Sequence, residues 1–465
     1  MRWFLHIALS IGGIIMMLGA IALGQEEPLS VQIDAGSVIC KQFMGFGVEW
    51  DSRGYPEAGI TDDDFVVIKN RVKWLRLPVA RIMMQAKWCY KGAGKFDWDS
   101  DEMKALYRHL DVCQSLGTTV FLADWGCELK WLQCPDVAKV DEPKYAEIIG
   151  TYLDYLLKKR GYTCIKYFIM VNEPNYEVKD WNRWKAGVKN LFAEFQKRGL
   201  DNKVIITGAD HANADDWHKR AVEQLQNILG AYDIHRYASE GELRNGGLGK
   251  YFLESWQYAL LKDPKAEGKP LVVGEAGLWG EGTGSAHNPM HMSYGYGVKM
   301  GDYAIQAANA GSWAVLAWML DDNSHPHFTW GMWMSKADGL KLKPWFYVWS
   351  LLCRSFPAGS TIVRTSHSSG DIQILAAYRE QNSKSPKKHW SFCLVNRADT
   401  PRTIRLRMIE GLRFNMSRYV YSMTSAKTDE NGFPVSFDER MYDLNAGADI
   451  SCEANSVVIL SSMTQ

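Results

Sequence analysis

The chain has 465 residues, and its 53 Lys and Arg balance 53 Asp and Glu, so its formal net charge is zero. This length suits two or three domains, because a (β/α)8 barrel by itself takes about 250 residues. The charge balance argues against a nucleic-acid partner, and 46% hydrophobic with 23% charged residues excludes a wholly disordered or fibrous chain. Composition leaves the oligomeric state undetermined.

Residues 1–24 are predicted to form a secretory signal peptide. Arg2 supplies a positive start, an apolar run extends from Trp3 to Leu23, and small residues up to Gly24 precede a polar stretch. We therefore expect a secreted or periplasmic protein that has no membrane segment after cleavage. An uncleaved anchor stays open as an alternative, because about 20 apolar residues can just span a bilayer.

The nine cysteines are compatible with export but show no metal-binding spacing. No Cys-x-x-Cys pair occurs, so we expect no zinc site, no other metal and no cofactor. An odd number leaves at least one thiol without an intramolecular partner. Cys127 and Cys134 share one loop-like stretch and are the best candidates for a local disulfide, whereas buried free thiols are the alternative for the others.

Strand-like apolar runs alternate with helical segments from about residue 43 to residue 350. Eight runs are predicted as strands: 43–50, 74–78, 119–124, 166–171, 204–208, 232–235, 271–274 and 313–318. Segments such as 101–116 and 145–159 carry apolar residues three and four apart, as amphipathic helices do. Eight strand–helix units predict an α/β fold, a closed (β/α)8 TIM barrel over residues 41–350.

The pattern changes after Pro344, where helical periodicity fades. Short alternating or apolar runs at 361–364, 372–378, 391–395, 403–408, 417–421 and 456–460 predict a C-terminal antiparallel β-sandwich domain over residues 351–465. Residues 29–39, within an N-terminal segment 25–40, also have strand character. We expect that segment to join the sandwich.

Barrel enzymes carry their chemistry at the carboxyl ends of the strands, and two predicted strands end in glutamates there. Glu173 follows the fourth strand within Asn172-Glu173-Pro174, and Glu275 follows the seventh strand after Gly274. Strands four and seven face each other across a barrel, so both carboxylates are expected at one cleft. Two carboxyls about 5–5.5 Å apart can perform retaining glycoside hydrolysis. Each glutamate alone is equally typical of a solvated strand end.

These motifs resemble the acid/base and nucleophile motifs of the clan A glycoside hydrolases. Three more matches accompany them: Arg76-Leu77-Pro78 at the predicted end of strand two, His235-Arg236-Tyr237 after strand six, and Trp318 at the end of strand eight. The resemblance covers about residues 40–350. The early strand and the late sandwich are further similar to families 30, 39 and 51 of this clan, and no exact family is assigned.

The resemblance implies cleavage of β-glycosidic bonds in an oligo- or polysaccharide by double displacement. Glu173 would act as general acid and then general base, and Glu275 as the nucleophile, kept ionised by Arg76 and Tyr237. Asn172 would hydrogen-bond the sugar 2-hydroxyl. His235 is a further candidate for substrate binding.

Ordinary structural roles are the alternatives for three of these residues. Arg76 could form an ion pair inside the barrel, His235 could be a satisfied buried histidine, and Tyr237 could be a packing residue.

The 19 tryptophans exceed what a core needs, and exposed indole faces suit sugar rings. Trp318 is expected to be a platform under the sugar, with Trp125 and Trp279 lining further subsites or packing on the barrel top. Other polar residues after predicted strands are candidates for sugar-hydroxyl contacts: Glu49, Asp51, Asp210, His211 and the polar residues within 321–327.

Two other functions stay open at this stage. A non-catalytic carbohydrate-binding barrel with a decayed site would share the fold, but it would not need both glutamates. A metal-dependent barrel hydrolase is disfavoured, because the first predicted strand lacks His-x-His.

Overall fold

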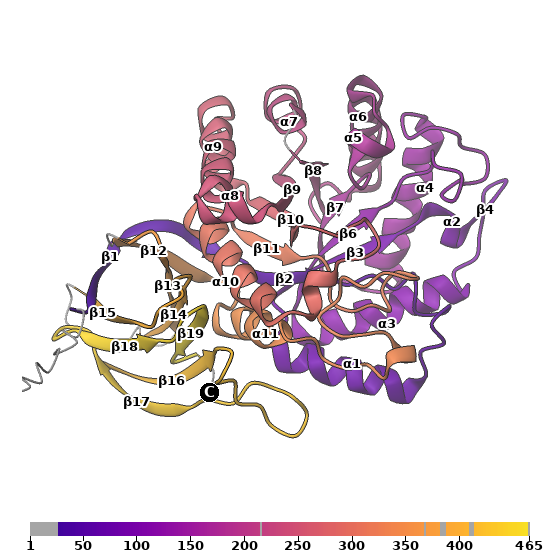
Figure 1. Ribbon diagram of the computed structural model, residues 1–465. Helices are drawn as coiled ribbons and strands as arrows, with labels where there is room; N and C mark the ends of the chain where they lie inside the picture. Colours follow the sequence, from indigo (N-terminus) through magenta and orange to yellow (C-terminus); the bar gives the residue numbers. More distant parts are fainter. Residues whose placement is uncertain (1–26, 214–215, 367–368, 382–386, 409–412, 464–465) are drawn as a thin grey trace, which may run out of the picture.

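The computed structural model describes residues 27–213, 216–366, 369–381, 387–408 and 413–463. The predicted signal peptide lies outside these residues. A barrel surrounded by helices stands beside a curled β-sheet, and strand β1 leads from the sheet into the barrel (Figure 1).

Eight parallel strands close the barrel, which confirms the predicted fold class. In chain order they are β2 (Gly45–Glu49), β3 (Val79–Met84), β6 (Thr119–Asp124), β7 (Ile165–Ile169), β8 (Ile205–Ala212), β9 (Ala231–Ala238), β10 (Leu271–Leu278) and β11 (Ala314–Ala317). Each strand pairs in parallel with its neighbours in this order, and β11 returns to β2. Glu173 therefore follows the fourth barrel strand, and Glu275 lies in the seventh.

Helices cover the outside of the barrel. The longer ones are α1 (Asp62–Leu75), α3 (Asp101–Leu116), α4 (Pro143–Asp154), α6 (Trp181–Arg198), α7 (Trp217–Leu225), α9 (Gly247–Lys262), α10 (Tyr294–Asn309) and α11 (Phe346–Ser355). The loops also carry short elements: α2 (Ala86–Cys89), α5 (Pro174–Glu177), α8 (Glu240–Arg244), the hairpin β4 (Tyr90–Gly92) and β5 (Lys95–Phe96), η1 (Tyr155–Lys159), η2 (Ala266–Gly268), η3 (Pro289–Met292) and η4 (Lys336–Asp338).

The second barrel strand is not where the sequence predicted it. Residues 74–78 contain the end of α1 and a connection, and the strand begins at Val79. Buried Phe65, Ile68, Val72 and Leu75 continue the helical spacing up to the last residue of α1. The prediction of a strand at 74–78 was wrong because Leu75 is the last residue of this helical stripe, and Leu77 and Pro78 lie in the connection that follows. The other seven predicted runs each overlap an observed strand.

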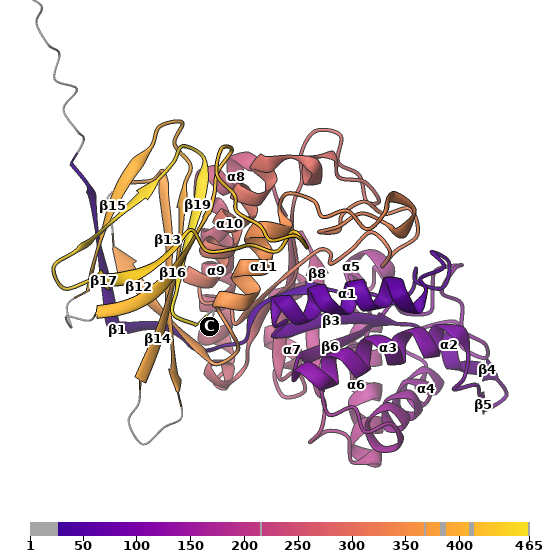
Figure 2. The same ribbon diagram turned by 90° about the horizontal axis from the view of Figure 1, so that it is seen from below.

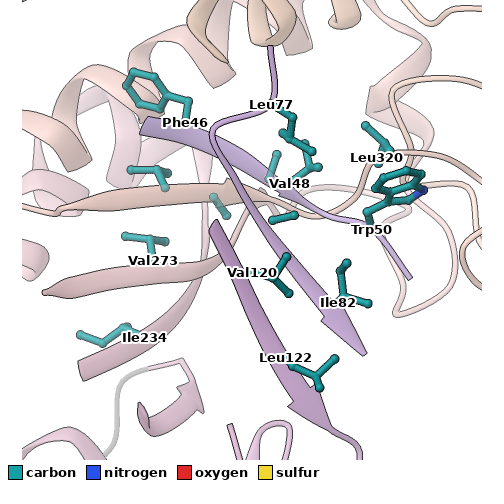
Figure 3. Close-up of a cluster of buried hydrophobic side chains, with 14 of the residues drawn as sticks. Phe46, Val48, Trp50, Leu77, Ile82, Val120, Leu122, Ile234, Val273 and Leu320 are labelled. Atoms are coloured by element: carbon teal, nitrogen blue, oxygen red, sulfur yellow. The ribbon is translucent and has the colours of Figure 1, made fainter. Parts of the chain in front are cut away.

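Side chains along the barrel strands point alternately into the barrel interior and outward under the helices, so they form two apolar layers. In β3, Ala80 and Ile82 pack outward against the helices, whereas Val79 and Met83 belong to the barrel interior. Arg81 shares the inward parity with these two residues. Figure 3 shows side chains of the outer layer, with Ile82 on β3 beside Leu122 on β6.

Nine strands form the second sheet, in the order β17-β16-β19-β14-β13-β12-β1-β15-β18. Their bounds are β1 (Leu29–Phe43), β12 (Ser360–Ser366), β13 (Ile372–Gln381), β14 (Lys387–Asn396), β15 (Arg402–Met408), β16 (Arg413–Tyr421), β17 (Asp438–Asp443), β18 (Ala448–Cys452) and β19 (Ser456–Ser461). β1 pairs antiparallel with β12 and parallel with β15. The N-terminal segment thus completes a sheet built from the far end of the chain.

The sequence missed β17 and β18, which are the two edges of this sheet. β18 alternates buried and exposed residues but is only five residues long, and β17 buries only one of its residues. Met441 of β17, for example, is 62% exposed.

The sheet has a buried core of its own and a second apolar face toward the barrel. Val31, Ile374 and Phe392 lie in the internal core, whereas Leu375, Val395 and other residues join the core around the helices. α10 and α11 lie between the sheet and the barrel strands (Figure 2).

All nine cysteines are buried and free, so the predicted Cys127–Cys134 disulfide was wrong. Burial raises the pKa of the Cys134 thiol to about 12, which keeps it protonated and unreactive. Among the described helices, none combines the length and apolar character required to cross a membrane.

Candidate active site

The two glutamates converge at the carboxyl end of the barrel. Glu173 precedes the short helix α5 with a left-handed backbone (φ 42°), and Glu275 lies within β10. A carboxylate oxygen of each lies within 4.8 Å of the other and of a ring nitrogen of His235. The side chain of Glu275 is 5% exposed and that of Glu173 is 23% exposed. Glu173 is therefore the carboxyl that solvent or a ligand reaches more easily.

Arg81 is the central cation of the site and is completely buried. Its Nη1 donates to Glu49 Oε2 at 2.8 Å and to Glu275 Oε1 at 3.0 Å. Its Nη2 donates to Asn172 Oδ1 at 2.7 Å and to Asp210 Oδ2 at 3.0 Å. One guanidinium thus orients groups from β2, β8, β10 and the end of β7.

His235 lies on β9 and connects the two glutamates to Asp210. Its Nε2 is 3.0 Å from Asp210 Oδ1, and its Nδ1 is 3.0 Å from Glu173 Oε1 and 3.5 Å from Glu275 Oε2. Burial lowers the pKa of His235, but the Glu275 and Asp210 carboxylates outweigh burial and raise this pKa well above its ordinary value. We therefore treat His235 as an imidazolium that donates from both nitrogens.

Tyr237 completes the contacts of Glu275, because its hydroxyl donates to Glu275 Oε2 at 2.6 Å. Burial, reinforced by the Glu275 charge, raises the pKa of Tyr237 well above its ordinary value, so the hydroxyl stays a neutral donor. Burial also raises the pKa of Glu275, and the nearby Glu173 adds to the rise, whereas His235 and Arg81 oppose it. The donors around Glu275 therefore offset part of the cost of keeping a buried carboxylate charged.

Arg76 does not belong to this site, contrary to the sequence prediction. It ends α1 with a left-handed backbone (φ 51°), is exposed, and donates to the backbone oxygen of Met463 at 3.2 Å. It precedes β3, so it lies at the amino end of the barrel strands, away from the glutamates. Arg81, within β3, makes the contact to Glu275 that was expected of Arg76.

The predicted aromatic residues lie around the same end of the barrel. Trp318 is 6% exposed, and both it and Trp125 pack on His325, with ring centroids 5.1 and 5.5 Å away. Trp279 is 46% exposed and lies 6.5 Å from the ring of Tyr237. Trp279 therefore presents the most open indole of the three next to the contacts of Glu275.

Among the described residues, two groups of acidic and histidine side chains could suggest a metal site, because the ligand atoms within each group lie within 4.8 Å of one another. Both groups include His235. Both ring nitrogens of His235 already face carboxylates at 3.0 Å. An imidazolium has no lone pair to offer a metal, so the contacts of both ring nitrogens to carboxylates favour an ion-pair network.

Comparison with known protein families identifies the family of the chain. A family model described as Cellulase (glycosyl hydrolase family 5) matches residues 36–333, which is more than half of the chain. The chain belongs to this family. It is a glycosidase, a hydrolase that acts on O-glycosyl bonds, and its clan is the one that its sequence motifs indicated. Comparison with curated protein sequences finds no match.

Solved structures of other glycoside hydrolases share the complete two-part fold. The family 30 subfamily 8 xylanase Xyn30A from Clostridium acetobutylicum has a TM-score of 0.64 and 14% identity, over 93% of this chain and 99% of that one. The family 39 enzyme from Xanthomonas axonopodis pv. citri has a TM-score of 0.60 and 14% identity, covering 93% and 97%. The family 51 α-L-arabinofuranosidase from Thermotoga petrophila has a TM-score of 0.65 and 12% identity, covering 93% and 99%.

Sequence reasoning about this glycosidase missed the role of Arg81 and assigned other roles to its partners. Glu49 and Asp210 were candidates for sugar contacts, but both are buried and bind the guanidinium. A charged residue in the middle of the apolar run 79–84 was the available signal, because such a residue must find partners inside the fold.

The free energy of unfolding of the glycosidase is expected to depend on pH through Glu49. Burial raises its pKa from 4.5 to about 8. Arg81 lowers this pKa only in part, because it also contacts two other carboxylates. Between these values the folded enzyme keeps a proton that the unfolded chain releases. The stability from this group is therefore complete below about pH 4.5 and is lost as the pH rises through 8.

Replacing Glu49 with Gln removes this titration while it keeps an oxygen acceptor for Arg81. From pH 5 to pH 8, the free energy of unfolding of Glu49→Gln relative to wild type should rise by on the order of 3 kcal/mol. Thermal unfolding of both proteins across this range measures the change. A constant difference between the two proteins would mean that Glu49 is already ionised in the folded enzyme at pH 5.

Proposed function

We propose that this glycosidase is a retaining hydrolase that cleaves β-glycosidic bonds in oligo- or polysaccharides by double displacement. The barrel, predicted over residues 41–350, would carry the reaction. The supporting observation is the approach of Glu173 and Glu275, whose nearest carboxylate oxygens are no more than 4.8 Å apart. Retaining enzymes hold their carboxyls about 5–5.5 Å apart, whereas inverting enzymes need about 6.5–9.5 Å to admit a water molecule.

In the first step, Glu173 donates its proton to the glycosidic oxygen while Glu275 attacks the anomeric carbon. The bond between that carbon and the leaving oxygen breaks, and the sugar becomes an ester of Glu275. The greater exposure of Glu173 suits the acid, because it must reach the leaving oxygen. The contacts of Glu275 to Arg81 and Tyr237 suit the nucleophile, because they favour its ionised form.

In the second step, a water molecule gives a proton to the Glu173 carboxylate and attacks the anomeric carbon. The ester bond to Glu275 breaks, and both glutamates return to their starting states. Glu173 can accept the proton because esterification has removed the Glu275 charge beside it. His235, held by Asp210, donates to Glu173 Oε1 and orients it in both steps.

Other residues near the glutamates have properties suited to binding the sugar. Arg81 engages the Asn172 side-chain oxygen, so the amide nitrogen of Asn172 is left to donate to the 2-hydroxyl. Trp318 would stack under the reacting sugar, and Trp279 and Trp125 would contact sugars in neighbouring subsites. The substrate is a carbohydrate whose identity a screen would determine, beginning with xylan, β-glucans and arabinofuranosides in view of the xylanase and arabinofuranosidase folds.

The acid role of Glu173 predicts a dependence on the leaving group. Glu173→Ala should hydrolyse polysaccharide on the order of 10²–10⁴-fold more slowly than wild type, because an unprotonated sugar alkoxide leaves poorly. Aryl β-glycosides with acidic phenols should retain most of their rate of bond cleavage, because such phenols need no proton. Single-turnover release of nitrophenol and dinitrophenol measures this difference.

Glu177→Ala is the matched control, because Glu177 lies one helical turn further along α5. The rate of Glu177→Ala relative to wild type should be the same for every leaving group. If Glu173→Ala slows all substrates equally, Glu173 is not the acid. Binding of oligosaccharide by the wild type without any turnover would instead indicate a decayed site.

A further inference from the structure

β10 contains one extra residue directly before Glu275. Opposite β9, Val273 pairs with Ile234 and Glu275 pairs with His235, so Gly274 has no partner of its own. The register with β11 also shifts in this part of β10. Two residues on one strand opposing one position on the other is the arrangement of a β-bulge.

This bulge decides which way Glu275 points. Val272 lies in the barrel interior and Val273 in the outer layer, so strict alternation would direct residue 275 outward, toward the helices. The extra residue reverses the parity, and Ala276 instead takes the outer position. Glu275 therefore faces the barrel interior only because Gly274 is bulged.

Asp233 occupies the space beside the bulge. It lies on β9, is fully buried, and its Oδ1 accepts a hydrogen bond from the backbone N–H of Gly274 at 2.9 Å. A Cβ on residue 274 would be 2.3 Å from the same oxygen, so the carboxyl fills the volume that a side chain would need. Gly274 and Asp233 are thus in direct contact, and a side chain at 274 would collide with the Asp233 carboxyl.

We propose that Asp233 is a positioning residue, which holds the Gly274 bulge and thereby directs Glu275 at the reacting carbon. The inference rests on the proposed role of Glu275 as nucleophile. Asp233 acts through the backbone amide next to the nucleophile, and its carboxylate also lies within 4.8 Å of ligand atoms of Asp210 and His235.

The chemistry required of Asp233 is that of an acceptor rather than a charge. Its Oδ2 has no hydrogen-bond partner within the described parts of the chain. Burial, with help from the Asp210 charge, raises the pKa of Asp233 to about 7, so the carboxyl is partly neutral under ordinary conditions. An asparagine can supply the same acceptor oxygen in nearly the same volume, whereas a leucine cannot.

The experiment compares Asp233→Asn with Asp233→Leu in the full-length enzyme. Asp233→Asn should keep kcat within about threefold of wild type, whereas Asp233→Leu should lower kcat by on the order of 10²-fold with little change in KM, because a misdirected nucleophile loses reactivity rather than binding. A 2-deoxy-2-fluoro glycoside should label Glu275 more slowly in Asp233→Leu by a similar factor, measured by mass spectrometry of the peptide.

A second route uses Gly274→Ala, in which the new methyl group would displace the Asp233 carboxyl. The double variant Gly274→Ala/Asp233→Leu should lose no more kcat than the worse single variant, because both changes break one contact. If Asp233→Leu proves too unstable to assay, Gly274→Ala alone tests the inference: it should lower kcat and slow the labelling of Glu275, and labelling at the wild-type rate would overturn the inference.

Asp263→Leu is a control for stability alone. Asp263 is also buried, but it accepts from Tyr232 and Lys269, away from the glutamates. It should lower the melting temperature without slowing the labelling of Glu275.

If Asp233→Asn and Asp233→Leu have equal kcat and Glu275→Ala is inactive, the inference about Asp233 is overturned. Full activity of Glu275→Ala would instead overturn the proposed function itself.

Discussion

Glu275→Ala is expected to abolish nearly all turnover, with a loss on the order of 10⁴-fold or more, because the first step has no substitute for the attacking carboxylate. The donors that hold Glu275, Arg81 and Tyr237, would remain around the vacated volume. Added azide can enter this volume as a small anion and attack the anomeric carbon. The product should be a glycosyl azide of inverted configuration, and NMR of the product mixture identifies it.

Glu281→Ala is a suitable control, because Glu281 is an exposed glutamate just beyond the end of β10. It should turn over substrate like the wild type and form no glycosyl azide. Unchanged activity in Glu275→Ala would rule out the assignment of the nucleophile.

Arg81→Leu is expected to have the largest effect on stability. The guanidinium is fully buried and contacts Glu49, Asp210 and Glu275 at 2.8–3.0 Å. Its removal leaves buried carboxylates without their cation, and breaking one buried pair already costs about 3–5 kcal/mol. Remaining folded enzyme should also have a strongly reduced kcat, because Glu275 would bind a proton more readily. Calorimetry and single-turnover assays measure the two effects.

The matched control is Arg76→Leu, at the position that the sequence motif favoured. Arg76 is exposed, so its replacement should change the free energy of unfolding by no more than about 0.5 kcal/mol and leave kcat unchanged. If Arg81→Leu is too unstable to purify, Arg81→Lys keeps a positive charge but cannot reproduce the four contacts of a planar guanidinium. If the Arg76 and Arg81 variants have the same free energy of unfolding and the same kcat, Arg81 is not the cation of the active site.

The sequence alone was sufficient to predict the barrel and its two glutamates. Apolar runs alternate with helical stripes because each strand and each helix must bury a face, and this requirement is local enough to be visible along the chain. Glu173 and Glu275 directly follow such runs, and the strand count placed them on strands four and seven, as the structure has them. The N-terminal strand could be predicted for the same reason.

Only the tertiary structure decided which arginine serves the site and which way the nucleophile points. Arg76 and Arg81 lie five residues apart, and their difference depends on where α1 ends and on the inward parity of β3. The direction of Glu275 depends on a bulge at Gly274, which exists only in the pairing of β10 with β9. Cross-strand register and the sharing of one buried cation among distant carboxylates are long-range properties, so no local pattern in the sequence specifies them.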